Sequence, residues 1–258
     1  MSEENAWYET GQQAVDNANK KGGGGGGGSW RFYIKPGQEA KIAFLDGDNS
    51  EEEPVLNYRE HQYDQSGVNA PMYATCVGAA QGCMFCKAGL RAYEAWPFTI
   101  LVIEPVYKDR DGNEHPFQRK LMVAKKEIMQ RILRFMQQRE GLTGTVWTLY
   151  RSTKKAYTIG DDWQFQEKIG KSEASPEERR KAMAAKFEIE EDKCERIDYV
   201  DELKPKSEDE LLAEGADIEA TKARAEQWTG GGGGGGGGGS RGGSSGGGGG
   251  RDAGVDYK

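Results

Sequence analysis

The 258-residue sequence lacks the features that mark membrane proteins, secreted proteins, P-loop enzymes and metal-dependent hydrolases. No apolar run approaches the roughly 20 residues that a membrane-spanning helix needs, and the acidic start MSEENAWYET has no apolar signal-peptide core. There is no Gly-x-x-x-x-Gly-Lys-Ser/Thr loop for a nucleoside triphosphate and no clustered carboxylate set for metal-assisted hydrolysis. We therefore expect a soluble cytoplasmic protein that is not an enzyme and has no membrane partner.

Glycine is concentrated at the two ends of the chain. Of 38 glycines, 24 lie in three runs within 22–28, 230–239 and 242–250. Such runs have no side chains to bury and behave as flexible coil. The sequence thus predicts a flexible arm over 1–29, a folded core over 30–170, a helical segment over 171–228 and a disordered tail over 229–258.

Charge is distributed unevenly along the chain. Residues 171–228 hold eighteen acidic and eleven basic residues, whereas residues 108–155 hold twelve basic and five acidic ones. These blocks are either two solvated faces without a partner or a polyanion-binding surface followed by an acidic segment. In the second interpretation, the acidic segment competes for the basic surface or recruits other proteins.

The pattern of apolar residues predicts a mainly β fold. Period-two alternation or short apolar runs predict strands at 30–35, 40–45, 55–63, 96–107, 117–124, 144–151 and 156–169. Three- and four-residue spacing predicts a helix over 125–139. This order fits the five-stranded OB-fold barrel, with its helix between the third and fourth strands, although another small barrel with a helical insert would give the same order.

The chain after residue 170 has the start signals of helices. Ser175 and Glu178 form one capping box, with Pro176 at the first helical position, and Ser207 and Glu210 form another. These helices have few apolar residues, so we expect them to pack on the barrel or to extend from it.

The scarce cysteines and histidines form the most specific motif. His61, Cys76, Cys83 and Cys86 are separated by 14, 6 and 2 residues, which suits one tetrahedral zinc ion in a subdomain at about 61–90. Four protein ligands leave no open position, so the site is predicted to be structural. His115 or Cys194 are alternatives to His61, and three buried cysteines that bind nothing are the alternative to a metal site.

Aromatic and basic residues occur together in the predicted strands, as in proteins that stack bases on rings and hold phosphates with Lys and Arg. We expect Trp30, Phe44, Trp96, Phe98 and Phe165 in the core, while Tyr33, Tyr63 and Trp147 fit packing and stacking equally well. The candidate DNA-binding residues are Arg31, Tyr33, Lys35, Arg59, Tyr63, Tyr107, Lys108, Lys120, Lys125, Trp147, Arg151, Lys154 and Lys155.

Several segments carry a family resemblance. Together with the His61, Cys76, Cys83 and Cys86 set, the stretches WRFYIKPGQEAKIAFLDGD, LMVAKKEIMQRILR and YTIGDDWQFQEKI resemble the bacteriophage single-stranded DNA-binding, helix-destabilising proteins over about 29–170. The resemblance implies an OB-fold with one embedded structural zinc ion, and a barrel cleft beside the zinc loop that holds DNA through tyrosines and basic residues. It also implies tails that contact phage replication, recombination and repair proteins, in the cytoplasm of the infected bacterial host.

The chain departs from this family pattern at both ends. Its N-terminal arm is acidic, with only Lys20 and Lys21 as a basic pair, and its acidity lies in 171–228 instead of the last residues. We therefore expect protein partners to bind through 171–228, and we expect that segment to cover the basic surface in the free protein. The leading hypothesis is a sequence-independent coat for single-stranded DNA, and the alternative is a zinc-stabilised adaptor that recruits replication or transcription proteins through its acidic helices.

Overall fold

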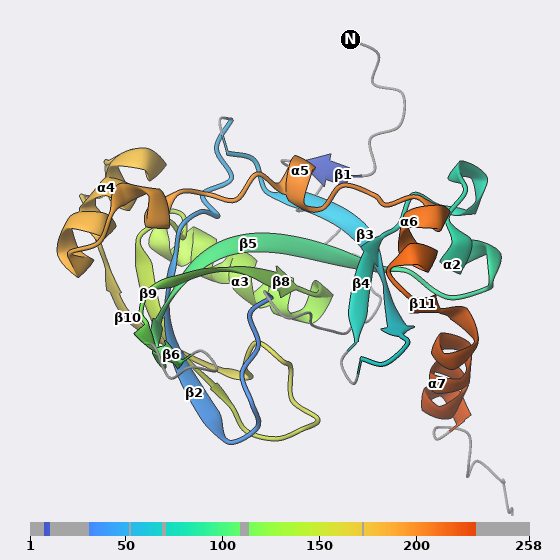
Figure 1. Cartoon of the computed structure of the whole chain (residues 1–258). Coiled ribbons are helices and arrows are strands. Elements are labelled where there is room, and N and C mark those ends of the chain that lie inside the picture. Colours follow the sequence, from blue (N-terminus) through green and yellow to red (C-terminus); the bar gives the residue numbers. More distant parts are fainter. Residues whose placement is uncertain are drawn as a thin grey trace, which may run out of the picture.

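A computed structural model of the chain describes residues 8–10, 31–51, 53–68, 71–108, 114–171 and 173–230. Trp30, residues 109–113 and nearly all of the two predicted glycine-rich ends lie outside these residues. The fold is mainly an antiparallel β-sheet with a few helices, as predicted (Figure 1). None of the described helices is both long enough and apolar enough to cross a lipid bilayer.

The principal sheet follows the order β1–β3–β5–β2–β9–β10. These strands are β1 (Tyr8–Thr10), β2 (Gln38–Phe44), β3 (Leu56–Gln65), β5 (Tyr93–Glu104), β9 (Thr145–Arg151) and β10 (Asp162–Lys168). Strand β8 (Gln118–Ala124) pairs with β5, while β4 (Met72–Thr75) and β11 (Ala216–Asp217) pair with β3. A separate hairpin joins β6 (Tyr107–Lys108) to β7 (Glu114–His115).

The sheet is open within the described residues, because no ladder joins β8 to β10. The segment 31–34 lies between them: the Phe32 N–H donates to the Leu121 carbonyl of β8 (2.8 Å), and the Ile34 N–H donates to the Thr158 carbonyl before β10 (2.7 Å). The strand predicted at 30–35 is therefore wrong as a regular sheet element. Its described backbone is extended, but its hydrogen bonds go to two different neighbours, so no continuous ladder forms.

The main core lies between the sheet and helix α3 (Lys126–Arg139). Phe44, Trp96 and Phe98 are buried there, as predicted, and Phe165 packs against this core while remaining partly exposed. The helix buries its periodic apolar face and ends at Arg139, with Glu140 as the C-cap. The φ of +94° at the following Gly141 and its close approach to Asp48 leave no room for a Cβ atom.

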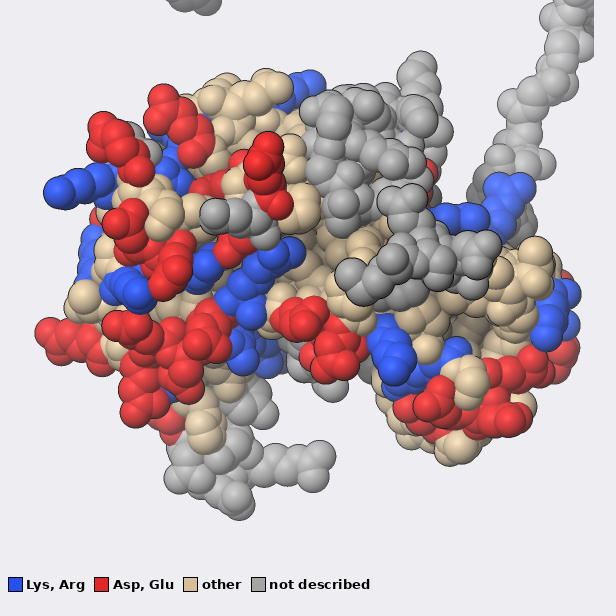
Figure 2. Space-filling model, turned by 90° about the horizontal axis from the view of Figure 1, so that it is seen from above, with Lys and Arg blue, Asp and Glu red and all other residues tan. Residues whose placement is uncertain are grey.

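The residues after 173 form short helices that pack on the sheet. They are α4 (Pro176–Phe187), η2 (Glu191–Cys194), α5 (Tyr199–Glu202), α6 (Glu208–Ala213) and α7 (Ile218–Gly230). Both predicted capping boxes are confirmed. Figure 1 shows this segment running along one side of the sheet, from α4 through α5 to α6, and Figure 2 shows acidic side chains on that side, over α4 and over α6.

Basic side chains of α4 make the ion pairs that anchor this helix, and Lys186 pairs with Glu167 of β10. Arg179 pairs with Asp48 at 2.7 Å and Arg180 pairs with Glu53 at 2.6 Å, both in the acidic loop after β2. Acidic side chains of this segment pair locally, as Glu177 does with Lys181, or with the lobe that carries α2, as Glu208 does with Lys87 at 3.3 Å. This anchoring differs from the expected docking of acidic groups on the basic residues of 108–155.

A buried polar cluster fixes the chain before α5 to the sheet. Asp46 is only 4% exposed; it accepts hydrogen bonds from the Thr99 N–H (3.1 Å) and from the Tyr199 hydroxyl, and Arg196 lies 3.4 Å away. The Thr99 hydroxyl also hydrogen-bonds that of Tyr199 at 2.7 Å. Burial raises the pKa of Asp46 from 3.8 to about 6, against the lowering effect of Arg196 and Tyr199.

This raised pKa predicts a defined pH dependence of stability. The folded protein binds a proton at Asp46 more tightly than the unfolded chain, so the group stabilises the fold most when it is protonated and loses that contribution as pH rises to about 6. Relative to Asp46→Asn, the wild-type free energy of unfolding should rise by up to about 3 kcal/mol from pH 7 to pH 4. Urea denaturation of both proteins across this range measures it; parallel profiles would contradict it.

Candidate metal centre and nucleic-acid interface

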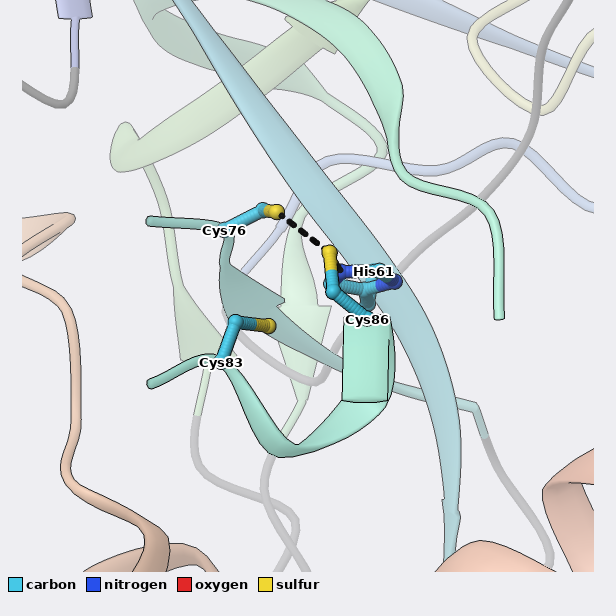
Figure 3. A group of neighbouring side chains, drawn as sticks. All are labelled: His61, Cys76, Cys83 and Cys86. Atoms are coloured by element: carbon cyan, nitrogen blue, oxygen red, sulfur yellow. Dashed lines mark hydrogen bonds between the residues drawn. The ribbon is translucent and has the colours of Figure 1, made fainter. Parts of the chain in front are cut away.

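The four predicted metal ligands come together at one point (Figure 3). Their donor atoms all lie within 4.8 Å of one another, with the Cys86 Sγ 3.4 Å from the Cys76 Sγ and 3.3 Å from the His61 Nε2. Ligands about 2.0–2.3 Å from a tetrahedral ion lie about 3.3–3.8 Å apart. The cluster could therefore hold one metal ion.

Local backbone structure places each ligand. His61 lies in β3 opposite Ala74 of β4, and the chain then returns so that the Cys76 N–H donates to the Arg59 carbonyl (2.7 Å). Cys83 precedes the short helix α2 (Met84–Lys87), which carries Cys86. The connecting turn uses Gly78 and Gly82, whose φ angles of +88° and +94° are unfavourable for other residues.

The chemistry of the donor set fits a metal ion. All the described cysteines are free thiols, and the hydrogen bond from Cys76 lowers the pKa of Cys83 to about 3, so a thiolate is already favoured there. The buried His61 Nδ1 has no hydrogen-bond partner, and the imidazole ring lies against Phe85 at 5.3 Å between centroids. The His61 ring therefore presents its Nε2 atom to the cysteine sulfurs.

The structure also places the alternative ligands. His115 is exposed in β7, and Cys194 is buried in a different apolar cluster with Leu45 and Met183. Neither belongs to the four-residue group, which contains His61.

A small apolar cluster supports the metal centre and connects it to the C-terminal helices. Tyr63 stacks on Phe85 with centroids 5.0 Å apart, and Leu211 of α6 packs in the same cluster. The lobe formed by β4 and α2 is therefore held from two sides, by β3 and by α6.

Several of the predicted DNA-binding residues lie at one place on the surface, where segment 33–35 meets the turn after β9. Tyr33 is 52% exposed, and Lys35, Lys154 and Lys155 are also exposed. Arg151 joins the two segments by donating to the carbonyls of Ile34 and Lys154, each at 2.9 Å.

Four other predicted residues are buried, so their expected placement on a free surface is wrong. Arg31 is 7% exposed and pairs with Glu60, and Lys125 lies under the sheet with its Nζ 3.8 Å from the centroid of the Tyr93 ring. Burial lowers the pKa of Lys125 to about 7.

The two buried aromatic candidates have ordinary packing roles. Tyr63 is covered by its stack on Phe85. Trp147 lies 4.4 Å from the Phe135 ring of α3, and its indole N–H donates to the Thr145 hydroxyl at 2.9 Å. Neither ring offers a free face for a base.

The remaining candidates lie in other elements of the fold. Arg59 is exposed beside the lobe formed by β4 and α2, and Lys120 is half-buried in β8. Tyr107 and Lys108 form β6, but their side chains lie outside the described residues.

Sequence reasoning missed two exposed tyrosines. Tyr157 is 40% exposed in the turn before β10, and Tyr150 is 38% exposed on β9, opposite Glu39 and Asp162. The alternation of 144–151 contained the signal for Tyr150, because Trp147 and Leu149 occupy the other face.

No family model matches the chain, and no curated protein matches it.

The metal centre leads to a direct test by substitution. Protein purified without added metal should carry one equivalent, and Cys86→Ser should abolish it and lower the Tm by on the order of 10 °C, because the β4–α2 lobe loses its support. Elemental analysis and thermal melting measure both effects. His115→Ala is the matched control and should keep the metal. Wild-type protein that is purified without any bound metal and has the same Tm as Cys86→Ser would contradict the assignment.

Proposed function

We propose that the protein binds single-stranded DNA without sequence preference and coats it during phage DNA replication, recombination and repair. The observation that carries this proposal is the group formed by Tyr33, Tyr157, Lys35, Lys154 and Lys155, which we term the tyrosine–lysine patch. The Ile34 N–H donates to the Thr158 carbonyl. Tyr33 directly precedes Ile34 and Tyr157 directly precedes Thr158, so the two tyrosines are neighbours of residues that hydrogen-bond each other. Exposed rings beside lysines suit stacked bases and phosphates of any sequence.

The order of the strands supports an OB-type architecture for this function. Strands β2, β5 and β8 precede α3, and β9 and β10 follow it, with ladders joining β2 to β5, β5 to β8, β2 to β9 and β9 to β10. The OB-fold is a partly open five-stranded barrel. In this interpretation, segment 31–34 spans the opening between β8 and β10 and brings Tyr33 to the barrel surface.

Zinc is the metal that this proposal assigns to the centre. Three cysteine sulfurs and one imidazole would form a closed tetrahedral set around an ion, which suits a structural Zn²⁺ without an open position for a substrate. His61, Cys76, Cys83 and Cys86 would hold the β4–α2 lobe beside β3. The ion supplies folding energy to this lobe and takes no part in a reaction.

A second function is favoured by the charge of the C-terminal helices. Figure 2 shows acidic side chains over α4 and α6, on the side where the C-terminal segment crosses the sheet. This surface suits basic partners. We propose that these partners are phage replication and recombination proteins in the cytoplasm of the bacterial host. A zinc-stabilised adaptor would use this face alone.

The stacking role predicts a difference between exposed tyrosines. Tyr33→Ala and Tyr157→Ala should each weaken binding of labelled oligo(dT) by about 5- to 150-fold, because each removes a stacking ring. Tyr150→Ala is the matched control: it is similarly exposed but lies opposite Glu39 and Asp162, whose charges repel phosphates, and it should leave affinity unchanged. Fluorescence anisotropy at fixed salt measures the three affinities.

The outcomes of this titration separate the two functions. Loss of affinity in the Tyr33 and Tyr157 variants alone supports the patch. An equal loss in Tyr150→Ala contradicts the patch, and no binding of oligo(dT) by the wild-type protein at low salt favours the adaptor.

A further inference from the structure

The loop between β9 and β10 carries three residues of the tyrosine–lysine patch, namely Lys154, Lys155 and Tyr157. The Asp161 carboxylate closes this loop at its base by accepting hydrogen bonds from the Ser152 N–H (2.8 Å) and the Ser152 hydroxyl (2.6 Å). These two hydrogen bonds lower the pKa of Asp161, so its carboxylate stays ionised at neutral pH. The two ends of the loop are thus held together.

Segment 33–35, which carries the rest of the patch, meets this loop at one point in the core. Ile34 and Ile159 are each 3% exposed in the main core, and the Ile34 N–H donates to the Thr158 carbonyl at 2.7 Å. Lys154 is exposed and lies four residues before Thr158. The core contacts alone therefore do not hold the lysine end of the loop beside segment 33–35.

The side chain of Arg151, the last residue of β9, supplies the missing contact. Its Nη1 donates to the Ile34 carbonyl and its Nη2 donates to the Lys154 carbonyl, each at 2.9 Å. The side chain is half-buried and its Nε atom is fully buried. Because a guanidinium group is planar and holds its donors at fixed angles, this fork sets the spacing between two backbone segments that are distant in the sequence.

We infer that Arg151 is a positioning residue of the patch, which acts through the Tyr157 loop and not through a DNA contact of its own. This inference rests on the proposed function and gives Arg151 a different role from the direct DNA contact expected from the sequence. Lysine side chains are long and flexible and reach phosphates from several backbone positions, whereas a stacked ring needs a defined one. A loop that is ordered before binding also loses less conformational freedom when the strand binds.

The salt dependence of oligo(dT) binding separates positioning from direct contact. Arg151→Gln and Arg151→Lys both remove the fork, so both should weaken binding by about tenfold, while the slope of log affinity against log salt stays at the wild-type value. A direct phosphate contact predicts instead a slope reduced by about 0.7 in Arg151→Gln and wild-type affinity in Arg151→Lys, and this result would overturn the inference. Lys181→Gln is the matched control for the loss of one positive charge, because Lys181 pairs with Glu177 on its own helix, and it should bind as the wild type does.

A double-mutant cycle with Tyr157→Ala tests whether Arg151 acts through the loop. If Arg151 positions the Tyr157 ring, the tenfold loss in Arg151→Gln should shrink to less than about threefold once that ring has been removed. Equal losses with and without Tyr157 would show that the two residues act independently and would overturn the inference. The same conclusion follows if Arg151→Gln binds as tightly as Lys181→Gln.

Hydrogen exchange measured by NMR tests the clamp without DNA and keeps the two proposals distinguishable. In Arg151→Gln, the Ile34 amide should exchange at least about tenfold faster than in the wild type, whereas the amide of Leu45, which donates to the Thr99 carbonyl at 2.9 Å, should not change. If the wild-type protein does not bind oligo(dT), the proposed function is wrong and this exchange decides alone: faster exchange at Ile34 supports the clamp, and unchanged exchange overturns it. If Tyr33→Ala weakens binding while Arg151→Gln changes neither affinity nor exchange, the clamp is overturned and the proposed function stands.

Discussion

The buried ion pair between Arg31 and Glu60 is the contact on which the arrangement of the surface depends. Glu60 accepts two hydrogen bonds from Arg31 (2.5 and 2.9 Å), one from Tyr58 (2.7 Å) and one from Tyr93 (2.6 Å). Burial alone would raise the pKa of Glu60, but the Arg31 charge and these hydrogen bonds together lower it below its ordinary value. A carboxylate supplied with four donors stays ionised in the interior, whereas loss of either partner of such a pair costs about 3–5 kcal/mol.

This ion pair connects two features that are far apart in the sequence. Arg31 begins the segment that carries Tyr33 and Lys35 to the surface. Glu60 precedes His61 in β3, so the same strand that receives Arg31 also supplies the imidazole of the metal centre. The position of the tyrosine–lysine patch relative to the metal lobe is thus set by one strand and one pair of charges.

The sequence was most informative where the signal is local. Strands β2, β3, β5, β8 and β9 were predicted because alternation or a short apolar run lies within each segment, and both capping boxes follow from four consecutive residues. The metal cluster was predictable because three of its ligands lie within eleven residues and cysteine is otherwise scarce.

Contacts between distant residues were not predictable in the same way. Alternation correctly separates Trp147 from Tyr150, but it does not show that α3 covers the face that carries Trp147. The sequence suggested that Arg31 is a surface cation, because its partner Glu60 lies 29 residues away. The contact of Asp46 with Tyr199 spans 153 residues and was equally hidden. The acidic composition of the C-terminal segment also concealed that its arginines make the anchoring contacts.

Photo-crosslinking of an oligonucleotide that contains 5-iodouracil, followed by mass spectrometry of the crosslinked peptides, tests the central claim most directly. The patch predicts crosslinks at Tyr33 and Tyr157, on two segments that are far apart in sequence but joined by the hydrogen bond from Ile34 to Thr158. Crosslinks confined to Tyr150 or to the helices after residue 173 would contradict it.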